Sequence, residues 1–151
     1  MSGVDAHLLS IQTLTMAFVG TSLMTMFSYV IGMIRKKKFS EPALLNELIS
    51  RLKQKSLGVL VPIAGWLLHY FIGLLFIISY QLYWRESDSH PTIINCIILG
   101  ALSGVIGICG WKLTFRIHPR PPSIDFKEFY SQLFFAHVVF GVGVFMPANW
   151  F

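Results

Sequence analysis

Apolar residues in this chain occur in four long blocks that are separated by polar segments. The blocks 8–34, 58–83, 93–111 and 129–150 contain no Lys, Arg, Asp or Glu. About 20 residues of helix cross the ~30 Å hydrocarbon layer of a bilayer, and a helix satisfies its own backbone hydrogen bonds there. The pattern therefore predicts four transmembrane helices in a single integral-membrane domain that spans residues 1–151.

A cleavable signal peptide is the alternative interpretation of the first block. Signal peptides place basic residues before their apolar core. Here the first Lys or Arg, Arg35, follows the block. The ionisable side chains that precede the block are Asp5 and His7. We therefore expect the first block to remain in the mature protein.

The segment after the first block has a different periodicity. Ser40 and Pro42 are typical of a helix start, and five apolar residues then recur at helical spacing: Leu44, Leu45, Leu48, Ile49 and Leu52. This pattern predicts a short amphipathic helix at about 41–55 that lies on the cytoplasmic membrane surface. It serves either as an anchored loop or as a site for a partner or an anionic lipid.

Charge is distributed unevenly between the connections. Segment 35–56 has seven Lys or Arg and two Glu, and segment 112–128 has four Lys or Arg against Asp125 and Glu128. Segment 84–92 has one Arg against Glu86 and Asp88. Basic loops stay in the cytoplasm, which predicts that both termini lie on the outer face. Arg35, Lys36, Lys37 and Lys38 are then expected to contact lipid at the inner interface.

Composition fits a membrane protein and leaves little support for other classes. Hydrophobic residues make up 54% of the chain and charged residues 13%. The net charge of +5 is explained by the basic loops, so we expect no nucleic-acid partner.

Cys96 and Cys109 lie in one block, thirteen residues apart, or about 20 Å of helix, and cannot pair with each other. No catalytic constellation is visible, which disfavours an enzyme without deciding the question.

Small residues mark the faces on which the helices are expected to pack. Gly65 and Gly73 lie four residues on either side of His69, Gly100 and Gly104 form Gly-x-x-x-Gly, and Gly141 lies four residues after His137. In lipid, close backbone approach over small residues drives helix association. We therefore expect a compact four-helix bundle with little interior volume. The recurrence of His-x-x-x-Gly also suggests two duplicated hairpins, with chance as the alternative.

Three segments resemble a known group of proteins. "AFVGTSLMTMFSYV", "GWLLHYFIGLLFIISY" and "FFAHVVFGVGVF" are similar to segments of small four-helix bacterial inner-membrane proteins of unknown function, the YagU-like group and its relatives. The resemblance implies a four-helix membrane fold in the bacterial inner membrane. It implies no activity.

His69 and His137 are the candidate functional residues. Both lie about 12–17 Å along their helices, near the midplane, where a polar side chain is costly and commonly faces the bundle interior. We expect them to face each other or a shared neighbour. They either stabilise packing by hydrogen bonds, bind haem or a metal ion, or line a path for a proton or small solute.

The chain's small size and its many packing faces favour a subunit or accessory protein of a larger membrane assembly, with a homo-oligomer or other membrane subunits as partners. A small transporter, a proton path or a haem-binding electron carrier that uses His69 and His137 is the alternative. We expect no cofactor in the first case and haem in the electron carrier.

Overall fold

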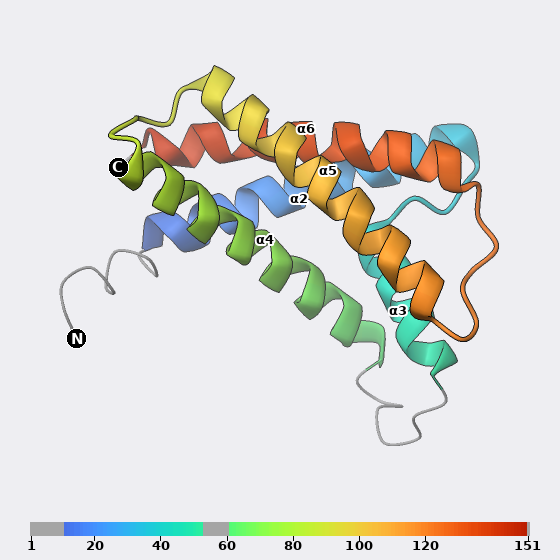
Figure 1. The fold of residues 1–151 in the computed structure, drawn as a ribbon. Coiled ribbons are helices and arrows are strands. Elements are labelled where there is room, and N and C mark those ends of the chain that lie inside the picture. The colour runs from blue at the N-terminus through green and yellow to red at the C-terminus, as the bar shows by residue number, and fades with distance from the viewer. Residues whose placement is uncertain (1–10, 53–60, 151) are drawn as a thin grey trace.

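The computed structural model describes residues 11–52 and 61–150, and in this part of the chain the secondary structure consists of helices joined by short connections, with no strand (Figure 1). Four helices are long and apolar enough to cross a membrane, as predicted: α2 (Ile11–Arg35), α4 (Val61–Glu86), α5 (Ile93–Ile117) and α6 (Phe126–Ala148). A fifth helix, α3 (Glu41–Arg51), lies between the first two. The prediction of an all-helical fold with four long apolar helices is thereby confirmed.

The helix boundaries differ from the predicted ones at the charged ends. The third helix was expected to end at residue 111 but continues to Ile117, and α6 begins at Phe126 rather than at residue 129. Charged residues do not end these helices, because long side chains reach outward while the backbone stays helical. Lys112, for example, places its Nζ 5.4 Å from the centre of the Tyr130 ring. The predicted starts at residues 8 and 58 lie outside the described residues.

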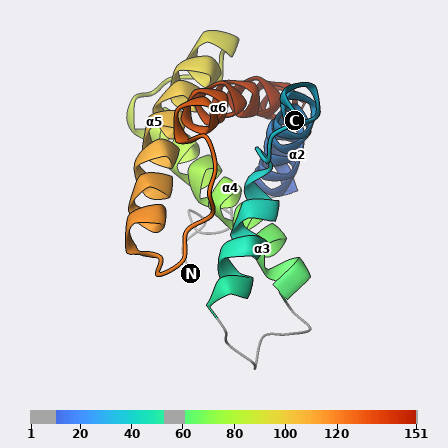
Figure 2. The ribbon, with the colours of Figure 1, turned by 90° about the vertical axis from the view of Figure 1, so that its right-hand side faces the viewer.

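α6 forms the centre of the bundle and packs against α2 on one side and α5 on the other (Figure 2). Its buried apolar face is formed by Phe129, Leu133, Ala136, Phe140 and Val144. This face is surrounded by side chains rather than by lipid, which explains why α6 is the most buried of the four long helices.

The α5–α6 contact depends on glycine. A Cβ added at Gly100 would lie 2.5 Å from the carbonyl oxygen of His137, and one added at Gly141 would overlap the carbonyl oxygen of Cys96. At Gly104 an added Cβ would lie 3.3 Å from the Cβ of His137. These approaches bring backbone against backbone, as expected where small residues drive packing in lipid.

α4 has different neighbours. It packs against α2 and α3 and makes few contacts with α5 or α6. A Cβ at Gly65 would lie 2.6 Å from the carbonyl oxygen of Pro42 in α3, and one at Gly73 would overlap Thr21 Oγ1 in α2. Tyr70 adds a hydrogen-bond contact of 2.9 Å between its hydroxyl and Ser22 Oγ. The two hairpins are therefore packed in different ways.

α3 begins at its predicted place and packs on the bundle. Ser40 is the N-cap residue and Pro42 lies in the first turn, although the Ser40 hydroxyl makes no capping bond. Leu44 and Leu48 are buried. The predicted extension to residue 55 passes into residues 53–60, outside the described part, and the place of α3 at a membrane surface stays a prediction.

The connection between α5 and α6 holds α3 in place. Arg51 Nη1 donates to the carbonyl oxygens of Arg120 and Pro121 at 3.2 and 2.9 Å, and Arg120 donates back to the carbonyl oxygen of Arg51. His118 Nε2 lies 3.1 Å from the carbonyl oxygen of Leu48. These bonds tie the first and third connections together.

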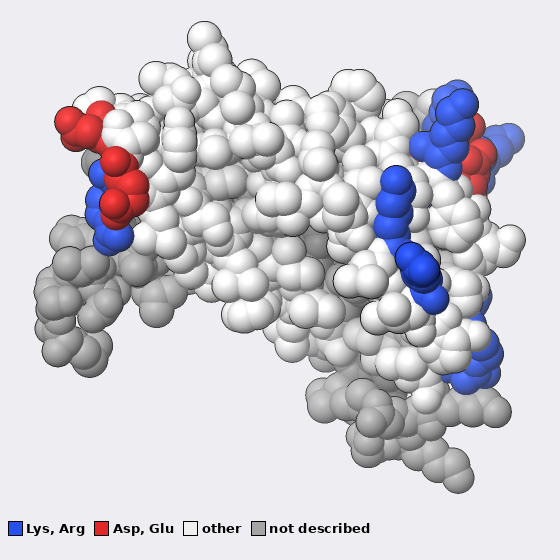
Figure 3. Space-filling view, viewed as in Figure 1, with Lys and Arg blue, Asp and Glu red and all other residues white. Residues whose placement is uncertain are grey.

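Most of the basic side chains gather at one end of the molecule, on the right of Figure 3, whereas acidic side chains and one basic group lie at the left end. Arg85 and Glu86, which form an ion pair, end α4. At the basic end Lys37 Nζ lies 2.9 Å from Asp125 Oδ2 and 2.8 Å from Glu128 Oε2. The hydrogen bonds to Glu128 and Asp125 raise the pKa of Lys37, and the bond from Lys37 lowers the pKa of Asp125. Asp125 also caps α6 by accepting from Glu128 N at 3.1 Å.

Candidate functional site

His69 lies in the middle of α4 and points into the bundle, with 7% of its surface exposed. Its Nε2 lies 3.0 Å from Thr25 Oγ1. The Thr25 hydroxyl donates its only proton to the carbonyl oxygen of Thr21 at 2.8 Å, so its oxygen accepts from His69. A neutral His69 therefore carries its proton on Nε2 and keeps Nδ1 as an acceptor.

His137 lies in α6 and is 5% exposed. Its Nδ1 lies 2.8 Å from the carbonyl oxygen of Leu133, so Nδ1 carries the proton and Nε2 is the acceptor. The ring meets Phe76 edge to face, with centroids 5.8 Å apart. Its Nε2 faces α5, where a Cβ added at Gly107 would lie 3.0 Å away.

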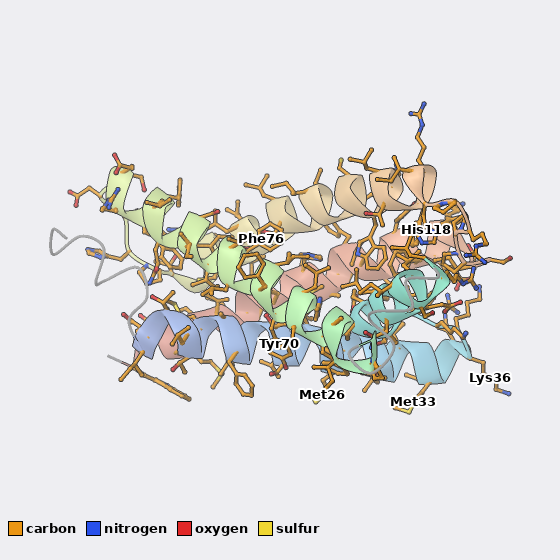
Figure 4. All side chains as sticks on the ribbon, turned by 90° about the horizontal axis from the view of Figure 1, so that it is seen from below. Met26, Met33, Lys36, Tyr70, Phe76 and His118 are labelled. Carbon is orange, nitrogen blue, oxygen red and sulfur yellow. The ribbon has the colours of Figure 1, made fainter. Side chains whose placement is uncertain are left out.

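Both histidines line a single cavity of about 230 Å³, called here the histidine cavity. The lining includes Glu41 from α3 and the rings of Phe76, Trp111 and Phe140. Figure 4 shows Phe76 on the inner side of α4, whereas Met26 and Met33 point away from the bundle. The expectation of little interior volume is wrong, because α4 leans on α2 and α3 and leaves space beside α5.

The histidine cavity opens between α4 and α5. Three residues at this opening, Ile72, Ile106 and Gly110, line the cavity and are also exposed on the molecular surface. The space-filling view is hollowed between these two helices (Figure 3). Since α4 and α5 are both candidate membrane spans, the opening faces the side of the bundle rather than either end.

Glu41 is the part of this site that the sequence analysis missed. It is the first residue of α3, yet only 1% of it is exposed. Ser28 Oγ lies 2.7 Å from Glu41 Oε1 and accepts from Gln132 Nε2 at 2.6 Å. Burial raises the pKa of the Glu41 carboxyl to about 7, so the group gains and loses its proton near neutral pH.

Polar atoms around the cavity also remain unpaired. Within residues 11–52 and 61–150, the buried atoms Glu41 Oε2 and Thr21 Oγ1 have no hydrogen-bond partner, and both residues line the histidine cavity. A buried polar group without a partner costs about 1–3 kcal/mol, so such groups commonly mark a place for water or a ligand. These two atoms are unsatisfied polar groups within the wall of the cavity.

No set of three His, Cys, Asp or Glu side chains within the described ranges is grouped closely enough to hold a metal ion. Cys96 is buried and Cys109 is exposed, and both are free thiols. Haem binding by His69 and His137 stays a prediction.

The site is described by its own geometry alone. No protein-family model, no curated protein and no solved structure matches this chain. The resemblance to the YagU-like group likewise stays a prediction.

Proposed function

We propose that this chain binds a lipid-soluble molecule whose head is a hydroxylated ring, such as an alkyl phenol or a quinol, in the histidine cavity. The observation that carries the proposal is the convergence of Glu41, His69 and His137, from three different helices, on one cavity that opens sideways. A ligand dissolved in the bilayer reaches such an opening without entering water.

The hydrogen bonds of the two histidines favour a ligand that donates protons. Thr25 fixes Nε2 of His69 as a donor, and Leu133 fixes Nδ1 of His137 as a donor. Each neutral imidazole then has one acceptor nitrogen left. A hydroxyl group on the ligand satisfies such an acceptor, and a second hydroxyl satisfies the other.

The size and walls of the histidine cavity favour a ring. A dry cavity of about 150 Å³ in another protein accepts benzene, so a volume of about 230 Å³ accommodates a substituted ring. Phe76, Trp111 and Phe140 offer aromatic contacts in the edge-to-face or offset arrangements that such rings prefer. An alkyl tail would leave past Ile72 and Ile106 into lipid.

The predicted role as a subunit of a larger membrane assembly, and the predicted bacterial inner membrane, remain proposals that rest on the sequence. A subunit that presents a lipid-soluble ligand to other membrane proteins is consistent with both. Co-purification with other membrane proteins in mild detergent supports the subunit role, and a single chain in isolation contradicts it.

The ligand proposal predicts saturable quenching of Trp111 fluorescence by a bromine-substituted decylphenol, because bromine quenches indole on contact and Trp111 lines the cavity. The protein is titrated in nanodiscs, and the same titration of a Trp111→Phe variant isolates the signal. His137→Phe should weaken binding about tenfold, since a hydrogen bond of about 1–1.5 kcal/mol is lost.

Matched controls separate the cavity from general partition into lipid. Bromine-substituted decylbenzene lacks the hydroxyl and should quench without saturation. Ile106→Phe narrows the opening and should reduce binding, whereas Leu102→Phe, one turn earlier on the exposed side of α5 and outside the cavity lining, should not. Equal quenching by both compounds, or equal behaviour of the two α5 variants, contradicts the proposal.

The proposed orientation is tested by labelling introduced cysteines. In a protein with Cys96→Ala and Cys109→Ala, a membrane-impermeant maleimide should label Ser89→Cys in intact cells and Ser123→Cys only after lysis. The reason is that the basic connections stay in the cytoplasm. The reverse labelling pattern would show that the basic end faces outward.

A further inference from the structure

We propose that the corner between α2 and α3 is a binding site for the phosphate headgroup of an anionic phospholipid. A second cavity of about 510 Å³, called here the corner cavity, lies at this place. Its lining includes Lys36, Lys37, Lys38 and Ser40 together with apolar residues of α2 and α3. Ser28, which contacts Glu41, also lines the corner cavity, but the corner cavity is separate from the histidine cavity.

The backbone builds the basic rim of the corner cavity. Lys36 has a positive φ of 53°, which turns the chain sharply after α2. Lys37 N donates to the carbonyl oxygen of Gly32 at 3.0 Å, and a Cβ at Gly32 would lie 2.9 Å from the carbonyl oxygen of Lys37. The glycine therefore permits the tight turn that places Lys36 to Lys38 beside the start of α3.

The charges around the corner cavity leave positive groups for a ligand. Lys37 is paired with Asp125 and Glu128, but Lys36 makes no ion pair within the described part of the chain. Lys38 is only weakly paired, with its Nζ 3.5 Å from Glu47 Oε2. The carboxylate of Glu47, which also lines the cavity, is held by Arg51 Nη2 at 2.5 Å.

The start of α3 adds donors for an anion. N–H groups in the first turn of a helix lack partners within the helix and carry a partial positive charge. In α3, Pro42 has no N–H and the Glu41 N–H bonds its own carboxyl, so the Ala43 N–H remains as a donor, and Ala43 lines the corner cavity. Ser40 is 7% exposed, and its Oγ is buried without a hydrogen-bond partner among the described residues. Because Ser40 lines the corner cavity, a change of its side-chain rotamer would present this hydroxyl to a phosphate oxygen.

The apolar walls indicate a lipid rather than free phosphate. Tyr29, Met33, Phe39 and Leu44 line the same cavity. Tyr29 and Met33 are exposed on the outer side of α2, 42% and 70% respectively, and Figure 4 shows Met33 pointing away from the bundle next to the basic end at Lys36. A phospholipid satisfies both features, with its phosphate at Ser40 and its chains along α2.

The test measures thermal unfolding in mild detergent with added dioctanoyl phosphatidylglycerol, dioctanoyl phosphatidylcholine or inorganic phosphate. We expect phosphatidylglycerol to raise the unfolding midpoint and the other two to have little effect. A Lys36→Gln/Lys38→Gln variant should need about thirtyfold more phosphatidylglycerol, since each of the two basic residues near an anionic lipid contributes about 1 kcal/mol. Ser40→Ala should weaken the response in the same direction.

Lys127→Gln is the matched control, because Lys127 is an exposed lysine at the same basic end that does not line the corner cavity. It should respond to phosphatidylglycerol as the unchanged protein does. An equal loss in Lys127→Gln would mean that overall charge, not this site, attracts the lipid, and would overturn the proposal. An equal response to inorganic phosphate would identify a free anion as the ligand and would also overturn it.

Discussion

A Gly141→Val protein should lose about 3 kcal/mol of its free energy of unfolding, the upper end of the usual cost of overpacking, since the overlap is with backbone that cannot relax. An added Cβ at Gly141 would overlap the carbonyl oxygen of Cys96 and would lie 3.3 Å from the Cα of Gly100. These are backbone atoms of α5, so no rotamer change relieves the overlap. The measurement is the thermal or denaturant-induced unfolding of the detergent-solubilised protein.

Gly110→Ala is the matched control on α5. A Cβ at Gly110 meets nothing within 4 Å, and alanine is favoured over glycine in a helix by about 1 kcal/mol. Its stability should therefore be unchanged or slightly higher. If Gly141→Val unfolds like the unchanged protein, the close α5–α6 approach at Gly141 is not what holds the bundle together.

The second large effect is a pH dependence that comes from Glu41. Burial raises the pKa of its carboxyl from 4.5 to about 7 in the folded protein. Below pH 4.5 both states hold the proton and Glu41 has no net effect. As the pH rises towards 7, the unfolded chain releases the proton and the folded one keeps it, so stability falls, by on the order of 3 kcal/mol in total.

Replacing Glu41 with glutamine should remove this dependence. Glutamine keeps the shape and the contact with Ser28 but has no charge, so Glu41→Gln should be more stable than the unchanged protein at pH 8 and similar at pH 4. The difference between the two proteins, measured as unfolding midpoints across this range, isolates Glu41 from His69 and His137, which share the cavity. Glu47→Gln, on the same helix, keeps Glu41 and should keep its pH dependence. Parallel curves for the unchanged protein and Glu41→Gln would contradict the assigned cause.

The sequence predicts the four long helices because hydrocarbon imposes one simple rule, a run of about 20 apolar residues. The same rule predicts that His69 and His137 avoid lipid, and both are buried. It does not predict how far α4 leans away from α5, because that depends on where α3 packs. The histidine cavity results from this arrangement of three helices, and no periodic pattern in the sequence indicates it.

Glu41 did leave a signal that the sequence analysis did not use. Glu41, Leu44, Leu45 and Leu48 follow the spacing i, i+3, i+4 and i+7, so the carboxyl lies on the leucine face of α3 rather than on its polar face. An acidic residue on an apolar stripe is expected to be buried and protonated or paired. That apolar stripe packs against the bundle, whereas the sequence analysis placed it against lipid.

α3 is a shared wall between the two cavities. Glu41 and Leu45 line the histidine cavity, while Ala43, Leu44 and Glu47 line the corner cavity on its other side. A rigid rotation of this single short helix would change the volume of both at once. A molecule that preferred one position of α3 would then alter the affinity of the other cavity, and thermodynamic linkage would make the two influences equal in size. The lipid composition of the surrounding bilayer would in this way influence ligand binding in the histidine cavity.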